Sequence, residues 1–344
     1  MVRAVGGPRR GRAHRRPPAV LRPPAVEPVA VGVDVGGTKV LAVALGAAPS
    51  GGAPGPILAE AEVPTPQGGA AVVQAIVATV RDVLAPHGPA VRATVGLGLP
   101  GLVDRSGVLR YGPNLPGVLD LDVAALVGEH LGEVLAVPFV AVDNDGNCAA
   151  LAEARGGAAT GASSALFIGL GTGIACGIVI DGRIWRGAHG FAGESGHIRV
   201  DPSGPRCACG AVGCWEAVAS GSALDRIARE LGADGGGALT AAERRGDPDP
   251  EGLRAAALDR FGEAVASGLV GLCNVLDPEV VVLGGSVMDA ADVLLPRITA
   301  AATAARFGGE RGADPPVRVA VLGRRAGAVG AALIGVDDPP GAAG

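Results

Sequence analysis

Apolar stretches that end in glycine turns recur along the chain and alternate with longer amphipathic stretches. The run VAVGVDVGG, which starts at Val29, predicts a buried strand that enters a glycine turn. Similar patterns predict strands at 57–65, 91–101 and 139–145, and helices at 70–84, 121–131 and 147–155. This repeated order of strand, turn and helix predicts an α/β fold built in layers.

The second half of the chain restarts the pattern of the first half. Residues 165–185 predict two strands joined by a glycine turn, as the segment from Val29 does, so a duplicated lobe is expected. The stretch 233–250, rich in Gly and Asp, is predicted to be a flexible surface connection. The other elements predicted in this half are strands at 279–285 and 317–323 and helices at 216–232, 252–276, 289–305 and from Ala326.

The composition indicates a globular chain without a membrane-spanning helix. Of 344 residues 48% are hydrophobic and 18% charged, and apolar runs are interrupted well before the roughly 18 residues that a membrane span needs. The net charge of -5 gives no overall attraction to nucleic acid. Residues 1–28 are rich in Arg and Pro and lack the apolar core of a secretory signal. We expect a disordered tail there, rather than a nucleic-acid or membrane-surface arm, and a cytoplasmic protein.

Glycine turns after three of the predicted strands are candidate phosphate or nucleotide sites, although a plain hairpin turn would explain each of them alone. Backbone N–H groups of such turns can face an anion, and Lys39, the only lysine of the chain, adds a compact charge. Asp34 can hold the Mg²⁺ that accompanies nucleotide phosphates. The residues assigned to the nucleotide are Asp34, Gly36, Gly37, Thr38, Lys39, Gly171, Thr172, Gly173, Gly284 and Gly285.

Acidic and amide residues gather where a short strand at 139–145 meets the next helix. Because side chains alternate along a strand, we expect only one of Asp143 and Asp145 to face a cleft between the lobes. Phosphoryl transfer needs a carboxylate to accept the proton of the attacking hydroxyl, and Asp145 is our candidate, with Asn144 orienting it. Helix capping is the competing interpretation of this cluster.

One histidine and three closely spaced cysteines predict a closed metal site. The motif C-x-C-G-x-x-G-C follows Glu-x-Gly-His, and such ligands suit a structural Zn²⁺ with no open position. The spacing fits a reducing compartment better than a disulfide framework. The metal ligands are predicted to be His197, Cys207, Cys209 and Cys214.

Together these motifs resemble the ROK family of repressors and sugar kinases, from about residue 29 to about residue 335. The Glu-x-Gly-His and cysteine motif is the most specific part of the resemblance. Ser195 and Asp143 depart from the residues usual in the family, and only the tail at 1–28 stands where its repressors carry a helix-turn-helix. The matching segments are 34–39, 96–101, 113–117, 144–145, 169–173, 190–198, 207–216 and 283–285.

The resemblance implies a two-lobed, actin-like (ribonuclease H-like) ATPase fold and a homodimer or homotetramer that transfers the γ-phosphoryl group of MgATP to a hexose. One lobe would comprise 29–146 with the helix 326–336 packed back on it, and the other 147–325 with the zinc-binding loop. Glucose is the expected sugar. Kinases for N-acetylmannosamine, N-acetylglucosamine or fructose, and a non-catalytic sugar sensor, are alternatives. The sugar-binding residues would be Asn114, Asn144, Asp145, Glu194, His197 and Glu216, with Asp145 as the base.

Overall fold

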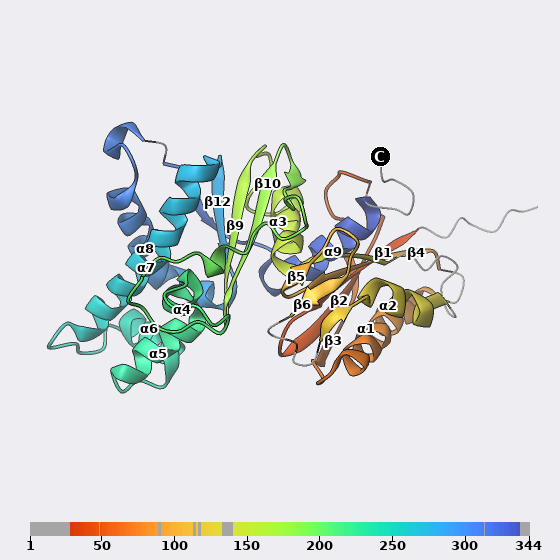
Figure 1. Cartoon of the computed structure of the whole chain (residues 1–344), viewed down its shortest axis with the longest axis horizontal. Coiled ribbons are helices and arrows are strands. Elements are labelled where there is room, and N and C mark those ends of the chain that lie inside the picture. Colours follow the sequence, from red (N-terminus) through yellow and green to blue (C-terminus); the bar gives the residue numbers. More distant parts are fainter. Residues whose placement is uncertain are drawn as a thin grey trace, which may run out of the picture.

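The computed structural model describes residues 28–47, 49–88, 91–112, 115, 118–132, 140–312 and 314–337. Two five-stranded sheets with helices packed on them form the molecule, which confirms the predicted α/β architecture (Figure 1). Residues 1–27 of the predicted tail and Asn114 lie outside the described residues.

The first sheet has the strand order β3-β2-β1-β4-β8. Its central strand β1 pairs antiparallel with β2 and parallel with β4, and β8 pairs parallel with β4. The carboxyl ends of β1, β4 and β8 therefore lie along one edge, where ligands bind in open α/β sheets. The strand bounds are β1 (Val29–Val35), β2 (Lys39–Leu45), β3 (Ile57–Pro64), β4 (Ala93–Leu99) and β8 (Val140–Asn144).

The second sheet repeats this topology with the order β11-β10-β9-β12-β13. Its central strand β9 is antiparallel to β10 and parallel to β12, and β13 is parallel to β12. The predicted repeat is thus confirmed at the level of strand order and direction. The bounds are β9 (Ala165–Leu170), β10 (Ile174–Ile180), β11 (Arg183–Ile184), β12 (Val280–Gly284) and β13 (Val317–Val319).

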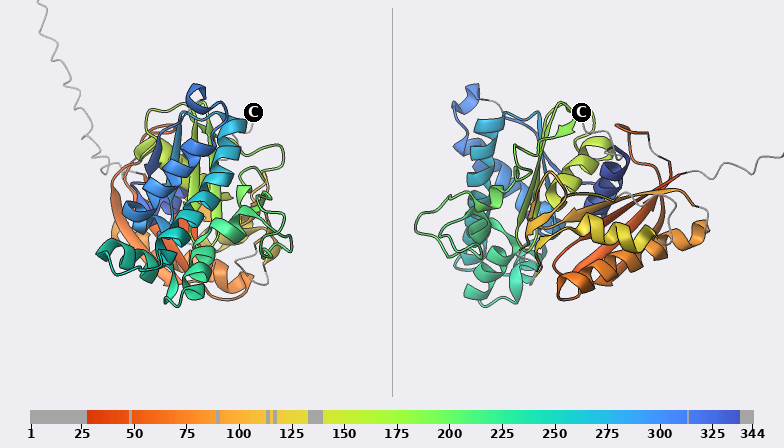
Figure 2. Two further views of the ribbon diagram at one scale, coloured as in Figure 1. Left: turned by 90° about the vertical axis from the view of Figure 1, so that its left-hand side faces the viewer. Right: turned by 45° about the vertical axis from the view of Figure 1, so that its right-hand side comes forward.

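Two helices, α3 (Asp145–Gly156) and α9 (Ala326–Asp337), lie between the sheets (Figure 2). Helix α9 packs on β1 and β4, α3 packs on β10, and the two helices pack on each other. Glycines allow this close contact, because a Cβ at Gly32 would lie 1.8 Å from the carbonyl oxygen of Ala328 and one at Gly96 would lie 1.8 Å from that of Ala331. The sheets are therefore joined by a tightly packed pair of helices.

The helices α1 (Gly69–Leu84) and α2 (Val123–Gly132) pack on the first sheet. The 19 residues Gly69–His87, which are α1 with the 3₁₀ turn η1 (Ala85–His87), are long and apolar enough by composition to cross a membrane. Val73, Ile76 and Val80 nevertheless belong to the buried core beside β1 and β2, so α1 is a core helix in this fold. A small sheet in the same half consists of β5 (Leu102–Val103), β6 (Leu109–Tyr111) and β7 (Leu119–Leu121).

The second sheet is covered by helices whose core is built around Trp215 and Phe261, both fully buried. Gly268 lets the indole lie against the long helix α7, because a Cβ there would lie 2.2 Å from the ring. The helices are α4 (Trp215–Ala219), α5 (Gly221–Glu230), α6 (Gly235–Arg245), α7 (Leu253–Leu276) and α8 (Ala291–Ala305). The remaining 3₁₀ turns are η2 (Ser195–His197), η3 (Ser286–Ala290), η4 (Gly309–Arg311) and η5 (Gly323–Arg325).

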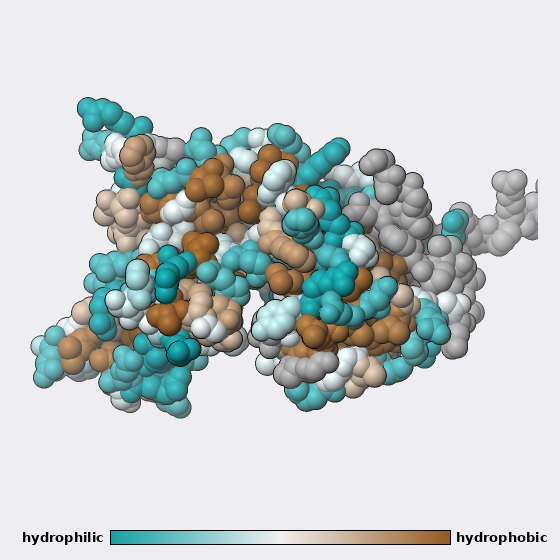
Figure 3. Space-filling model, in the orientation of Figure 1, coloured by the Kyte–Doolittle hydropathy of each residue, from teal (hydrophilic) through white to brown (hydrophobic). Residues whose placement is uncertain are grey.

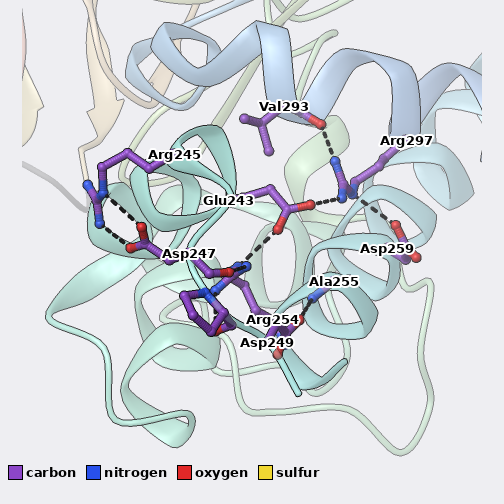
Figure 4. A network of polar contacts seen from close by, with 10 residues as sticks. Glu243, Arg245, Asp247, Asp249, Arg254, Ala255, Asp259, Val293 and Arg297 are labelled. Atoms are coloured by element: carbon purple, nitrogen blue, oxygen red, sulfur yellow. Dashed lines mark hydrogen bonds and ion pairs between the residues drawn. The ribbon is translucent and has the colours of Figure 1, made fainter. Parts of the chain in front are cut away.

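The prediction of a flexible connection at 233–250 is wrong for its middle part, which is helix α6. Gly236 packs against Leu224, where a Cβ would come within 2.6 Å of that side chain, so the glycine serves packing. Near the other end Glu243 accepts hydrogen bonds from Arg254 at 2.9 Å and Arg297 at 2.5 Å (Figure 4). These contacts come from α7 and α8, and the local composition could not indicate them.

Candidate functional site

A cavity of about 450 Å³ lies between the sheets, at the edge where their parallel strands end. The molecular surface is notched between its two halves (Figure 3). The cavity brings together residues that the sequence placed at three separate turns and at the acidic cluster. The predicted residues in its lining are Asp34, Lys39, Asp145, Gly171, Gly284 and Gly285.

Asp145 is the first residue of α3 and faces this cavity. Asn144 caps the helix, since its Oδ1 accepts the N–H groups of Gly146 at 2.8 Å and of Asn147 at 3.2 Å. The capping interpretation therefore holds for Asn144, and it leaves the carboxylate of Asp145 directed at the cleft. The helix begins two residues earlier than predicted, because the cap is Asn144.

The environment of Asp145 suits a proton acceptor. Burial, together with the neighbouring charges of Asp34 and Glu194, raises the pKa of Asp145 to about 7, although the hydrogen bond from the N–H of Gly146 lowers it. Burial also raises the pKa of Asp34 to about 6, against the opposing charge of Lys39. A carboxyl group with a pKa near neutrality can accept a hydroxyl proton efficiently at physiological pH.

Asp143 serves a different purpose from Asp145. It is buried, accepts a hydrogen bond from Arg186 Nε at 2.6 Å and another from Asn147 Nδ2 at 2.7 Å. Alternation along the strand does not separate Asp143 from Asp145, contrary to the prediction, since residues two apart in a strand share a face. They separate because β8 ends at Asn144 and the chain turns into α3.

The turn between β1 and β2 presents charge to the cavity. Lys39 lines it and forms an ion pair with Glu62 at 3.2 Å. The amide of Gly36, predicted to face a phosphate, donates instead to the carbonyl of Lys39 at 2.8 Å, because it closes the hairpin. Gly37 and Thr38 are exposed at the tip of the turn.

A carboxylate stabilises the turn between β9 and β10. Glu216 accepts the N–H of Ile174 at 2.9 Å, and a Cβ at Gly173 would lie 2.2 Å from Glu216 Oε2. Gly285 has a φ of 83° and its Cβ would lie 2.3 Å from the carbonyl of Leu170, so only glycine fits where β12 meets this turn. Glu216, predicted to bind sugar, thus also shapes a predicted phosphate turn.

A second cavity of about 410 Å³ adjoins the first and shares Gly171, Ser286 and Asp289 with it. Thr172 lines this second space and not the first. The sequence reasoning missed its outer wall, because that wall is α6 in the stretch assigned to a connection. Asp234, which is the N-cap residue of α6, was the available signal in the sequence. The residues missed are Ser222, Asp225, Gly236, Gly237, Thr240 and Arg244.

The predicted metal ligands converge on one point. One donor atom from each of His197, Cys207, Cys209 and Cys214 lies within 4.8 Å of all the others. Cys207 Sγ is 3.7 Å from His197 Nδ1, and Cys209 Sγ is 3.6 Å from Cys214 Sγ. Tetrahedral Zn–S bonds of about 2.3 Å imply edges of about 3.8 Å, so this donor set fits a closed zinc site.

Glycines shape the loop around these ligands. Gly213 has a φ of 75°, and a Cβ there would lie 1.5 Å from the carbonyl of Asp201. Cys207 also donates its N–H to the carbonyl of Ala211 at 2.8 Å, which closes the tight turn between the cysteines.

The loop before Cys207 carries Glu194 near Asp145. Burial raises the pKa of Glu194, while the charge of His197 lowers it. The charge of Glu194 also raises the pKa of Asp145, so the two carboxylates are close enough to interact electrostatically. Ser195, the next residue after Glu194, is buried. Because His197 directs Nδ1 at the sulfur atoms, its Nε2 remains for another partner.

Known proteins match nearly the whole chain. A glucokinase of Streptomyces coelicolor is 33% identical over 90% of this chain and 98% of its own length. The crystal structure of a ROK family glucokinase from Streptomyces griseus, in complex with glucose and AMPPNP, superposes with a TM-score of 0.77 at 33% identity, covering 88% of this chain and 98% of that one. The xylose repressor of Bacillus subtilis is 29% identical over 73% of this chain and 63% of the repressor.

The fold that these proteins share with the chain is the actin-like ATPase fold, as predicted. The ROK family profile matches residues 30–337. The chain therefore belongs to the ROK family.

Proposed function

We propose that the chain is an ATP-dependent hexose kinase whose favoured acceptor is glucose. The observation that carries the proposal is Asp145, a carboxyl group with a pKa near 7 in a cleft whose walls are two glycine turns and a charged lysine. A sugar sensor would need the sugar-binding groups but not a base beside Lys39. The relatives named glucokinase support the same assignment.

In the proposed reaction the sugar lies between Asp145 and the loop with Glu194 and His197. Asp145 accepts the proton of the 6-hydroxyl as its oxygen attacks the γ-phosphorus, so the hydroxyl is activated as the phosphate arrives. Asn144 fixes the start of α3 and with it the direction of the Asp145 carboxylate. Glu194, His197 and Glu216 supply hydrogen bonds to sugar hydroxyls, which both donate and accept.

The phosphoryl donor would occupy the 450 Å³ cavity, and its nucleoside the adjoining 410 Å³ cavity. Asp34 would hold Mg²⁺, which is supported by its position in the lining of the cavity and by burial that raises its pKa, an effect that a nearby cation would offset. Bound Mg²⁺ would neutralise charge on the phosphates. A structural Zn²⁺ held by the cysteine loop would keep His197 in position.

The chain would have two lobes, one formed by 29–146 with 326–336 and the other by 147–325. Closure of these lobes would exclude water from the transfer. We also propose that the chain forms a homo-oligomer. The test is formation of sugar phosphate by the purified full chain with a panel of sugars, each offered with ATP or polyphosphate, and release of ADP is measured as well where ATP is the donor. We expect glucose with ATP to give the highest kcat/KM. Turnover of N-acetylmannosamine, N-acetylglucosamine or fructose but not glucose would overturn the choice of sugar, and binding of sugar without turnover of any would favour a sensor.

A further inference from the structure

Ion pairs between charged residues link the two sheets beside the 450 Å³ cavity. Glu62 Oε2 accepts from Lys39 Nζ at 3.2 Å and from Arg324 Nη1 at 2.7 Å. Arg324 also pairs with Glu60 through its other terminal nitrogen. Lys39 and Glu62 belong to the first sheet, whereas Arg324 lies in η5, which follows β13 of the second sheet.

Only the two cations of this set line the donor cavity. Lys39 and Arg324 both contribute to its wall, whereas Glu60 and Glu62 do not. A single carboxylate oxygen of Glu62 is thus shared by two cations whose other sides face the space proposed for the phosphates. Such an arrangement is what a carboxylate standing in for an anionic ligand would produce.

These ion pairs are weak enough for phosphate to replace Glu62 as the partner of both cations. The side chains of Lys39, Glu62 and Arg324 are 37%, 40% and 53% exposed, and exposed ion pairs are weak because water and salt screen them. A triphosphate carries several charges, and a guanidinium binds phosphate oxygens through two parallel hydrogen bonds. A phosphate chain should therefore outcompete Glu62 for both cations.

We propose that Arg324 is a second phosphate-binding cation beside Lys39, and that Glu62 occupies both cations until the donor's phosphates displace it. The proposal rests on the proposed function, because it concerns the donor site of that kinase. The ligand of Arg324 is a phosphoanhydride chain, and the identity of the nucleobase does not matter to it. Arg324 should therefore favour ligands with more phosphates, while the nucleoside contacts lie elsewhere.

The chain offers a matched control for Arg324. Arg325 is adjacent, has the same charge and pairs with Glu60 at 2.6 Å, yet it does not line the cavity. Glu129, an exposed acid on α2, controls for the change in net charge when Glu62 is neutralised. The variants are thus Arg324→Gln, Arg324→Lys, Arg325→Gln, Glu62→Gln and Glu129→Gln.

The measurement is calorimetric binding of Mg²⁺·AMPPNP, and separately of AMP, to each full-length variant without sugar. We expect Arg324→Gln to weaken AMPPNP binding about tenfold and Arg324→Lys about threefold, as loss of a charge-assisted bidentate contact implies. Arg325→Gln should leave it within about twofold, since a screened surface charge acts weakly. Glu62→Gln should tighten binding about threefold relative to Glu129→Gln, because the competing anion is gone. AMP binding should be the same in all variants.

Equal effects of Arg324→Gln and Arg325→Gln would overturn the role of Arg324. Weaker or unchanged binding by Glu62→Gln, relative to Glu129→Gln, would overturn the displacement of Glu62 and show a purely structural ion pair. If the wild-type chain bound no nucleotide at all, the proposed kinase function would fail, which differs from either of these patterns. Thermal melting of each variant checks that a weaker affinity does not come from misfolding.

Discussion

The two sheets of the molecule have the same strand order but present different chemistry at equivalent hairpins. The β1–β2 turn directs Asp34 and Lys39 at the cleft, whereas the β9–β10 turn offers Gly171 and no charged side chain. The second turn is instead stabilised by Glu216, which accepts a hydrogen bond from the N–H of Ile174. The hairpin of the first sheet thus supplies charged side chains to the cleft, and the hairpin of the second sheet supplies a glycine backbone.

The edge strands of the two sheets also differ, in the sign of the charge that they bring to the cleft. In the first sheet β8 leads into α3 and places Asp145 at the cleft, and in the second sheet β13 leads through η5 and places Arg324 there. The acid that would accept a proton and the cation proposed to hold phosphates therefore come from corresponding positions of the two sheets. Duplication of a sheet gives two equivalent turns that can diverge in charge without disturbing the fold.

The largest effect should follow from removing the acid of the first half. Asp145→Asn keeps the size and the hydrogen-bonding shape of the side chain but cannot accept the proton, so we expect kcat to fall about 10³-fold. Sugar affinity, measured by calorimetry, should change less than about threefold, because the amide still bonds to hydroxyls. Loss of sugar binding in parallel with kcat would contradict the assignment of Asp145 as the base.

The strands and glycine turns of both halves could be predicted from the sequence, because buried strands are continuous apolar runs and the turns need glycine. The metal ligands could be predicted because their spacing is local. The pairing of Glu62 with Arg324 could not, since 262 residues separate them. Helix α6 was missed because the three glycines at its start disfavour a helix, and because Gly236 and Glu243 depend on tertiary partners in α5, α7 and α8.

The next effect concerns the metal site, which belongs to the second half alone. Removal of zinc by a chelator, or Cys209→Ser, should lower kcat/KM for the sugar roughly 10- to 100-fold, because His197 loses its fixed position. Metal content by mass spectrometry should fall with it. Cys273→Ser is the control, since Cys273 lies half-buried outside the ligand cluster. Full activity in a zinc-free protein would contradict the role of the site.

A smaller effect is expected from pH. The pKa of Asp145 is about 7, and the ionised form is the base, so kcat/KM for the sugar should rise with pH through this value. Between pH 8 and pH 6 we expect a fall of about tenfold, measured at low MgATP, where neighbouring Asp34 is without its cation. A profile flat down to pH 5 would mean that the carboxyl group has an ordinary pKa and that burial does not act as described.

The smallest effects test the difference between the two hairpins directly. Lys39→Met removes the charge of the first turn and should raise KM for ATP about tenfold, whereas Thr172→Ala in the second turn should raise it about twofold, since no charge is lost. Both variants should leave KM for the sugar unchanged. The Lys39 effect should also shrink at high salt, because ions screen the attraction between an ammonium and a phosphate, and the Thr172 effect should not. If Thr172→Ala had the larger effect, the second hairpin would contribute more than backbone fit, and charge would not be what distinguishes the two copies.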